Sequence, residues 1–522
     1  MKYGFFDDNK REYVINTPRT PLPWINYLGT NGFFSLISNT AGGYCFYRDA
    51  KHRRILRYRY NNVPADNGGR YFYINDGTES WTPSYMPMKK KLDFYECRHG
   101  MGYTKITGEK NGIKAEETFF VPVNDNCEIH RVKLTNTSGD VKNFKLFSFV
   151  EFCLWNAQDD MLNYQRNLNT AEVEIEGSTL YHKTEYRERR NHYAFYSVNA
   201  EIDGFETDRD TFLGAFNGFD TPDSVIEGKA KNSVASGWYP IASHMLNVTL
   251  KAGEEKEFIF VLGYIENEQE KKFDSLDVIN KDKAHEMIAR YNTTELCDKA
   301  FAELNEYWDK LLSVYTIKSD DEKLDRMVNI WNPYQAERNF QFSRNISYYA
   351  TGTFRGVGVR DTAQDILSMV PFDLRRAKDK LNLLFTQQYQ DGHCNHYCFP
   401  TEGWEPETRI HSDNHLWLVM TTYRIVTEEG KLDYLDEVVD FYDGNSATVW
   451  EHIKKSIEFC MENLGENGFP LMLSSDWNDM LYKVCREGKG ESIWTAMQFG
   501  TVLCQIAELA ELKGEDKKKD SF

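Results

Sequence analysis

The sequence has no apolar run approaching the roughly 18 residues that a membrane-spanning helix needs. The first residues, MKYGFFDDNKREYV, are interrupted by charges too soon to form the apolar core of a signal peptide. The 10 cysteines are scattered rather than set at the spacings of a disulfide framework, which indicates free thiols in a reducing compartment. These absences predict a soluble, cytoplasmic protein.

Positive charge is also in deficit. The 62 Lys and Arg residues face 80 Asp and Glu residues, and the net charge of −18 argues against nucleic acid or an anionic membrane as a partner. Aromatic residues, by contrast, make up 14% of the chain. Aromatic faces stack on sugar rings but also fill the cores of β-sandwiches, and composition alone favours the core interpretation.

The length of 522 residues predicts two to four domains, and the hydrophobic pattern changes along the chain. Residues 171–182 (AEVEIEGSTLYH) alternate apolar and charged positions, and residues 244–265 contain two strands joined at an Ala-Gly turn. We expect an antiparallel β-sandwich over residues 1–270, a helical linker over 271–315 and a helical domain over 316–522.

The helical half shows apolar residues at helical spacing. Leu324, Val328 and Trp331 share one face of a predicted helix, and the segment SATVWEHIKKSIEFCMENLG presents another face and stops at Gly465. A toroid of paired helices around a central pocket fits these lengths, although other helical arrays remain possible. The six or seven helices expected after residue 316 are about half of a double ring, so we expect the chain to end inside this domain.

The segment RNISYYATGTFRGVGVRDTAQD combines glycines with Arg344, Arg355 and Arg360. Main-chain N–H groups and forked guanidinium groups together can surround an anion such as phosphate. The alternative is a helix start capped by Asp361, with its arginines in solvent. The spacing matches neither GxGxxG nor a Walker A motif, so a nucleotide site is not expected.

Two histidine-containing segments follow. QDGHCNHYCFP invites a zinc interpretation, but ligands so close together on a short loop make a poor tetrahedron, so we expect His396 to line a pocket instead. IHSDNHLWLVM places Asp413, Asn414 and His415 before an apolar helix, where helix capping is the ordinary interpretation.

The segment SSDWNDML carries Asp476 and Asp479 around Trp477. These acids are too close in sequence to be the two opposed carboxylates of an inverting hydrolase, which lie roughly 6.5–9.5 Å apart with the sugar between them. One acid suffices if the nucleophile arrives as an anion, and phosphate is such a nucleophile. The alternative is structural, with Asp476 turning the backbone and Trp477 packing.

At these residues the chain resembles the inverting disaccharide phosphorylases of glycoside hydrolase family 94, and the cellobiose phosphorylases most of all. The resemblance runs from PRTPLPWINYLGTNGFFSLISNTAGGYCFYRDA through RYRYNNVPADNGGRYFYINDG and FVEFCLWNAQDDMLNYQRN to RGVGVRD and SDWNDML. It implies an N-terminal β-super-sandwich, a helical linker and an (α/α)6 barrel, of which this chain holds the first part.

The resemblance also implies roles for individual residues. Asp479 matches the general acid of the family, and Arg344 matches a phosphate-binding arginine.

The other matching residues bind sugar. Trp477, Arg355 and Asp361 match the residues that hold the non-reducing sugar. Gln165 and Arg166 match residues that reach the site of a neighbouring subunit in a homodimer. The loops DGHCNHYCFP and SDNHLWL depart from the usual family pattern, which leaves the acceptor sugar open.

The implied reaction is cellobiose plus phosphate to α-D-glucose 1-phosphate plus glucose, with disaccharide and phosphate as partners and no metal or organic cofactor. A water-poor pocket beside Trp477 is expected to raise the pKa of Asp479. Three alternatives stay open: phosphorolysis of another β-glucoside (a cellodextrin, cellobionate or laminaribiose), an inverting hydrolase, and a non-catalytic sugar-binding fragment. The hydrolase would need a base from among Asp365, Glu405 and Asp413.

Overall fold

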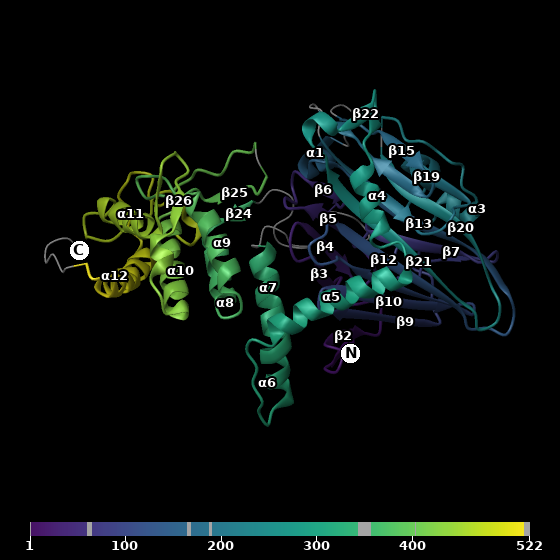
Figure 1. Ribbon diagram of the computed structural model, residues 1–522, viewed down its shortest axis with the longest axis horizontal. Coiled ribbons are helices and arrows are strands. Elements are labelled where there is room, and N and C mark those ends of the chain that lie inside the picture. Colours follow the sequence, from purple (N-terminus) through teal and green to yellow (C-terminus); the bar gives the residue numbers. More distant parts are fainter. Residues whose placement is uncertain are drawn as a thin grey trace. The chain divides into compact units, whose positions relative to one another are not determined.

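The computed structural model describes residues 2–59, 65–163, 169–186, 191–237, 239–342, 356–401 and 403–515. The chain divides into two compact units, and the first division falls after Lys310. Strands dominate the N-terminal unit, drawn from purple to teal in Figure 1, and helices dominate the C-terminal unit, drawn from teal through green to yellow.

The N-terminal unit is built on two antiparallel sheets. The ten-stranded sheet has the order β1 (Gly4–Asp7), β2 (Glu12–Ile15), β9 (Phe94–Gly100), β10 (Tyr103–Lys110), β11 (Ile113–Phe120), β12 (Cys127–Asn136), β21 (Glu255–Glu266), β18 (His192–Val198), β16 (Thr179–His182) and β15 (Val173–Glu176). The nine-stranded sheet has the order β19 (Gly204–Asp208), β20 (Pro240–Leu250), β13 (Lys142–Trp155), β6 (Arg54–Leu56), β5 (Gly43–Tyr47), β4 (Phe33–Ser38) and β3 (Ile25–Leu28), with β7 (Arg70–Asn75) pairing with β13 and β8 (Ser80–Trp81).

Aromatic rings and one buried ion pair join the two sheets face to face. Phe72 on β7 meets Phe260 on β21 with ring centroids 5.0 Å apart. Arg70 on β7 pairs with Glu128 on β12 at 2.7 Å, and neither side chain is exposed. This sandwich core takes up many of the aromatic residues, as the composition suggested.

The strand predictions in this unit are confirmed. Residues 171–182 form β15 and β16, which pair from Val173–His182 to Glu176–Thr179. Residues 244–265 lie in β20 and β21, but these strands belong to different sheets, so the turn at Gly253 carries the chain from one layer of the sandwich to the other. Hydrophobic alternation in the sequence indicates which face of a strand is buried. It does not indicate to which sheet the strand belongs, because strands of both sheets alternate in the same way.

Helices α4 (Asp282–Ala289) and α5 (Thr294–Leu312) follow the sandwich, in the segment expected to be a helical linker. Shorter elements of the unit are α1 (Ala157–Asn163), α2 (Arg209–Leu213) and α3 (Asp223–Glu227), the 3-10 helix η1 (Gln269–Lys271), and the strand pairs β14 (Asn169–Thr170) with β17 (Glu185–Tyr186) and β22 (Phe273–Ser275) with β23 (Val278–Ile279).

The C-terminal unit is helical. Its helices are α6 (Glu322–Arg326), the π-helix η2 (Met327–Trp331), α7 (Asn332–Phe342), α8 (Val359–Met369), α9 (Leu374–Phe385), α10 (Asn414–Glu429), α11 (Val449–Glu462) and α12 (Ile493–Lys513), with 3-10 turns η3 (Asp433–Asp436) and η4 (Asp479–Leu481). Helix α10 packs against α8, α9, α11 and α12. Two short strand pairs, β24 (Val357–Gly358) with β25 (Tyr397–Cys398) and β26 (Val438–Asp440) with β27 (Ser446–Thr448), connect the loops.

Two helix predictions need correction. The apolar face expected for residues 321–331 is not buried, because Leu324 is 48% exposed and no residue of α6 or η2 is fully buried. Helix α11 buries Val449, Ile453 and Ile457 as expected, but it ends at Glu462 with Asn463 as its C-cap, before Gly465.

Candidate active site

The loop that carries Asp479 is held by backbone pairing between two segments far apart in sequence. The N–H of Ser474 donates to the carbonyl of Ile410 at 3.0 Å, and the N–H of Ser412 donates to the carbonyl of Ser475 at 3.0 Å. Residues 410–412 therefore lie beside residues 473–475, just before Asp476. This pairing brings the side chains of His411 and Asp479 close together.

Asp476 supports this loop from inside. Its Oδ1 accepts the N–H of Asn478 at 2.8 Å, and its Oδ2 accepts the hydroxyl of Ser492 at 2.7 Å. The residue is buried, and Ser492 is the N-cap of α12. Asp476 therefore has the structural role that was the ordinary interpretation of the first acid in DWND.

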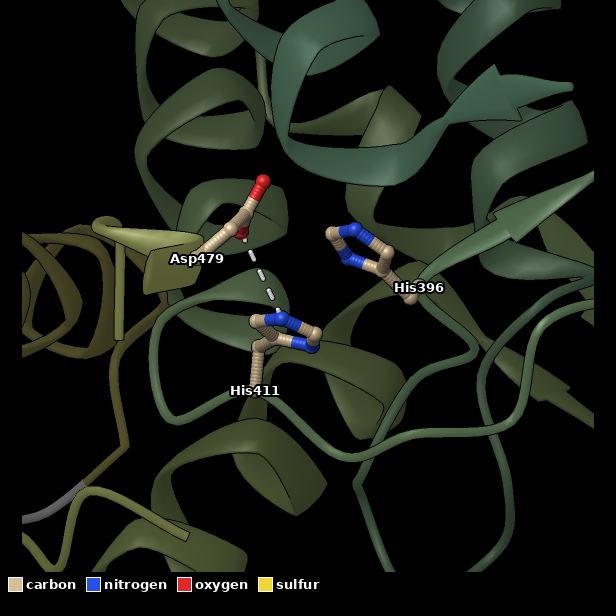
Figure 2. A group of neighbouring side chains, drawn as sticks. All are labelled: His396, His411 and Asp479. Atoms are coloured by element: carbon tan, nitrogen blue, oxygen red, sulfur yellow. Dashed lines mark ion pairs between the residues drawn. The ribbon is translucent and has the colours of Figure 1, made fainter. Parts of the chain in front are cut away.

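Asp479 opens the 3-10 turn η4, and its side chain is 45% exposed. Its Oδ1 accepts a hydrogen bond from Arg360 Nη2 at 2.8 Å and lies 3.4 Å from His411 Nε2 (Figure 2). The second acid of the motif therefore faces solvent on one side and two basic groups on the other.

Arg360 is the centre of this arrangement. It is the second residue of α8 and is buried, yet its guanidinium group contacts three residues in two other chain segments. Besides Asp479, Nη1 donates to the carbonyl of Asp476 at 3.2 Å and lies 3.4 Å from both oxygens of Asp413. The planar fork of an arginine suits such a multiple contact, because its donors point in several fixed directions.

Asp413 occupies the N-cap position of α10, as expected, but its side chain makes no capping hydrogen bond. Its Oδ2 accepts from Trp417 Nε1 at 3.1 Å instead, and the carboxylate faces Arg360. Burial raises the pKa of Asp413, and Arg360 opposes that rise. Asp361 is not the N-cap of α8 either, because Gly358 holds that position and Asp361 lies in the first turn.

The pKa of Asp479 shifts opposite to the expected direction. The contact with His411 and the ion pair with Arg360 hold the pKa of this carboxyl well below its usual range, and burial opposes them only in part. The expectation of a raised pKa for Asp479 was wrong, because the sequence around Trp477 does not reveal the two basic groups, His411 and Arg360, that lie 68 and 119 residues from Asp479 along the chain.

An exposed aromatic surface lies beside the acid. Trp477 is 50% exposed and Trp494 is 37% exposed, and their ring centroids are 6.1 Å apart with an interplanar angle of 29°. The guanidinium carbon of Arg360 lies 6.0 Å from the centre of the Trp477 ring. Two accessible indoles next to a carboxylate make a surface on which a sugar ring can stack.

His396, His411 and Asp479 place donor atoms within 4.8 Å of one another (Figure 2). The two imidazole rings are stacked, with centroids 3.9 Å apart and an interplanar angle of 14°, so their in-plane lone pairs run side by side instead of converging. Arg360 also binds the carboxylate oxygen nearest His411. This arrangement does not suit the tetrahedral geometry of zinc, and we assign no metal site to it.

The other residues of the HCNHYC segment do not converge on a metal position. His393 pairs with Asp391 at 2.6 Å, and its ring stacks on Tyr389. Cys394 and Cys398 are buried. Of this segment, His396 is the residue that reaches the group around Asp479.

The structure brings part of the predicted site together. Asp479 and Trp477 lie in one loop, and Asp361 lies in the first turn of α8, next to Arg360. Arg344, Arg355, Gln165 and Arg166 lie outside the described residues. The sequence placed Arg360 among the arginines that could surround an anion, whereas in the structure its guanidinium group pairs with Asp479 and Asp413. No site role was predicted for His411, because nothing in its local sequence distinguishes it.

Two family models match the chain, one over the β-sandwich and one over the helical unit. Residues 11–294 match the family described as "Glycosyl hydrolase 94, supersandwich domain", and residues 307–522 match "Glycosyl hydrolase 94 superfamily, catalytic domain". A bacterial glucoamylase complexed with acarbose superposes with a TM-score of 0.54 at 14% identity, covering 95% of this chain and 68% of the glucoamylase. The likeness to the glucoamylase concerns the fold.

Curated relatives are also similar over the length of the chain. An N,N'-diacetylchitobiose phosphorylase of Vibrio proteolyticus is 32% identical, over 100% of this chain and 66% of the relative. A solabiose phosphorylase of Paenibacillus borealis is 29% identical, over 97% of this chain and 63% of the relative. This chain thus spans about two thirds of the length of these relatives. None of the helices in the described ranges is long and apolar enough to cross a membrane.

The antiparallel β-sandwich and the helical unit that follows it confirm the predicted fold class. The two family matches occur in the same order along the chain, and the first alone covers more than half of it. This chain belongs to glycoside hydrolase family 94.

Proposed function

We propose that this chain carries the β-sandwich and the general acid of an inverting disaccharide phosphorylase. In this reaction phosphate attacks the anomeric carbon of a β-linked disaccharide, and an acid protonates the oxygen of the departing sugar. The observation that carries the proposal is the half-exposed carboxylate of Asp479 beside the exposed indole of Trp477, in a chain of this family. Asp479 is the proposed general acid.

The other residues that the sequence motifs predict complete the proposed site. Trp477, Arg355 and Asp361 would hold the non-reducing sugar, and Arg344 would bind phosphate. Gln165 and Arg166 would reach the acceptor side of a neighbouring subunit in a homodimer. We also propose that the protein works in the cytoplasm and needs no metal or organic cofactor, because phosphate itself is the nucleophile.

We further propose which disaccharide the enzyme cleaves. The resemblance of the sequence motifs favours cellobiose, which would yield α-D-glucose 1-phosphate and glucose. The Vibrio relatives at 32% identity are named N,N'-diacetylchitobiose phosphorylases, and that sugar has the same reacting bond type with an acetamido group on each ring. Both disaccharides are therefore the first two substrates to test.

The decisive experiment incubates the chain with each disaccharide, with and without inorganic phosphate, and follows sugar 1-phosphate by phosphorus NMR. We expect an α-sugar 1-phosphate that forms only with phosphate. Asp479→Asn should reduce the rate by roughly 10²–10⁴-fold, because it removes the proton donor. Asp391→Asn is a matched control, since Asp391 also pairs with a histidine but lies in another loop.

Two outcomes would overturn the proposal. Release of free sugar at the same rate without phosphate would favour a hydrolase, whose base would have to come from Asp365, Glu405 or Asp413. Asp413 suits that role poorly, because Arg360 and Trp417 both hold its carboxylate. An Asp479→Asn variant as active as the Asp391→Asn variant would exclude Asp479 as the acid.

A further inference from the structure

The contacts of His411 constrain where its protons lie. Its Nδ1 lies 3.2 Å from the carbonyl oxygen of Arg409. A carbonyl oxygen can only accept a hydrogen bond, so Nδ1 carries a proton. On the other side of the ring, Nε2 lies 3.4 Å from Oδ1 of Asp479. A carboxylate oxygen also only accepts, so this second contact is favourable when one proton lies between the two atoms, on Nε2 or on Oδ1.

We propose that His411 is a positioning residue that shares one proton with Asp479, and that this is the proton delivered to the leaving sugar. The catalytic part of this inference rests on the proposed function. It also resolves a conflict in the site: Asp479 must act as an acid, yet Arg360 and His411 favour its ionised form. The shared proton is held on the histidine until the acid needs it.

The proton transfer balances over one turnover. The proton passes from His411 Nε2 to Asp479, and Asp479 gives it to the glycosidic oxygen as the bond to the anomeric carbon breaks. That bond's electron pair stays on the leaving oxygen, and a phosphate oxygen forms the new bond to carbon. The proton lost by hydrogen phosphate when its ester forms returns through solvent to the pair of His411 and Asp479.

The groups around His411 support this assignment. The face of its ring stacks on His396, whose pKa is lowered to about 3 by burial, so that His396 is neutral at pH 7. Arg360 on α8 favours the anionic form of Asp479 and so favours the proton on His411. Asp413, at the start of α10, adds a negative charge near His411, and Arg409 adds a positive one near His396.

Backbone pairing fixes the separation of the two partners. His411 forms isolated bridges with Leu473 and Ser475, which precede Asp479 by a few residues. Substrate binding can then shift the proton without moving the chain: a sugar placed on Trp477 excludes water from Asp479, and exclusion of water raises the proton affinity of a carboxylate.

The first test reads the proton directly and needs no turnover. The full chain is labelled with ¹⁵N-histidine, and the resonances of His411 are assigned by their loss in His411→Gln. At pH 7 we expect both ring nitrogens of His411 to be protonated in the unmodified protein. In Asp479→Asn the Nε2 resonance should move to the unprotonated position. An Nε2 that is unprotonated in both proteins, or protonated in both, would overturn the proposal.

The second test uses the pH profile of phosphorolysis. In His411→Gln we expect kcat to fall roughly 10–100-fold, the range of a weakened acid, with KM changed less than about twofold. The alkaline limb of the profile should move to lower pH, because the histidine that holds the shared proton is gone and Arg360 still favours the ionised form of Asp479. His393→Gln is the control, since its pairing with Asp391 lies outside this group. An unchanged profile in His411→Gln would refute the role.

The two tests separate the two proposals. If the unmodified chain forms no sugar 1-phosphate but the Nε2 resonance responds to Asp479→Asn, the proton sharing stands and the proposed function fails. If phosphorolysis occurs and the Nε2 resonance does not respond, the function stands and the shared proton is wrong. Circular dichroism of both variants establishes that each is folded.

Discussion

At the scale of single residues, Arg360 donates to Asp479 from one end of its guanidinium group and faces Asp413 from the other. Its buried position means that two carboxylates on different loops depend on one cation. Their environments push them in opposite directions, because the exposed Asp479 keeps a low pKa whereas burial raises the pKa of Asp413. Such a separation is typical of sites where two acids have different tasks.

We predict that Arg360→Gln lowers the free energy of unfolding by about 3–5 kcal/mol, because it leaves the buried carboxylate of Asp413 without its cation. The pKa of Asp479 should rise in the same variant, since an attractive charge is lost. Urea unfolding measures the first effect. Arg424→Gln is the control, because Arg424 forms an exposed pair with Glu428 and should change stability by less than about 1 kcal/mol. Equal losses in the two variants would contradict the role of Arg360.

At the scale of elements, the start of α12 holds the DWND loop. The Ser492 hydroxyl accepts the N–H of Thr495 at 3.1 Å, which caps the helix, and donates to Asp476 at 2.7 Å. Helix α11 has an equivalent cap, where Thr448 accepts the N–H of Glu451 at 3.2 Å. Ser492 therefore caps α12 and also holds Asp476 of the DWND loop, whereas Thr448 caps α11.

We predict that Thr448→Ala costs about 1 kcal/mol, the ordinary loss of an N-cap. Ser492→Ala should cost about 2–4 kcal/mol, because it also leaves a buried oxygen of Asp476 without a donor. Only Ser492→Ala should weaken disaccharide binding, since it loosens the loop that holds Trp477 and Asp479. Urea unfolding and isothermal titration with the disaccharide compare the two variants. Identical behaviour would show that α12 does not position the loop.

At the scale of the whole molecule, several histidines are buried in the neutral form. Burial lowers the pKa of His99 to about 4 and the pKa values of His182, His244, His396 and His415 to about 3. In the unfolded chain these groups return to a pKa of about 6.5. Because the unfolded state binds more protons below that pH, stability is fully present above about pH 6.5 and is lost as pH falls.

We predict that the free energy of unfolding drops between pH 7.5 and pH 5.5, by about 1.4 kcal/mol for each buried histidine. In His244→Gln that drop should be smaller by about 1.4 kcal/mol, because one such group has been removed. Urea unfolding at the two pH values gives the difference. A drop of the same size in the variant would mean that His244 does not titrate as its burial indicates.

The sequence alone was enough for local structure and for family. Alternating residues predicted β15 and β16, and the motifs from residue 18 to DWND carried the resemblance. These features are readable because strand alternation, helix periodicity and a contiguous motif are all local. The same patterns overestimated burial on α6 and η2, because neither of these two described segments contains a buried residue.

The tertiary structure decided the chemistry around Asp479. Three features depend on contacts between residues far apart in the sequence: the two different sheets to which β20 and β21 belong, the hydrogen bond from Ser492 to Asp476, and the meeting of Arg360, His411 and Asp479. Arg360 lies 119 residues from Asp479, and no local pattern encodes that distance. The sequence by itself determined which groups are present, and the fold decided which charges face each other, because electrostatic energy depends on separation in space and not along the chain.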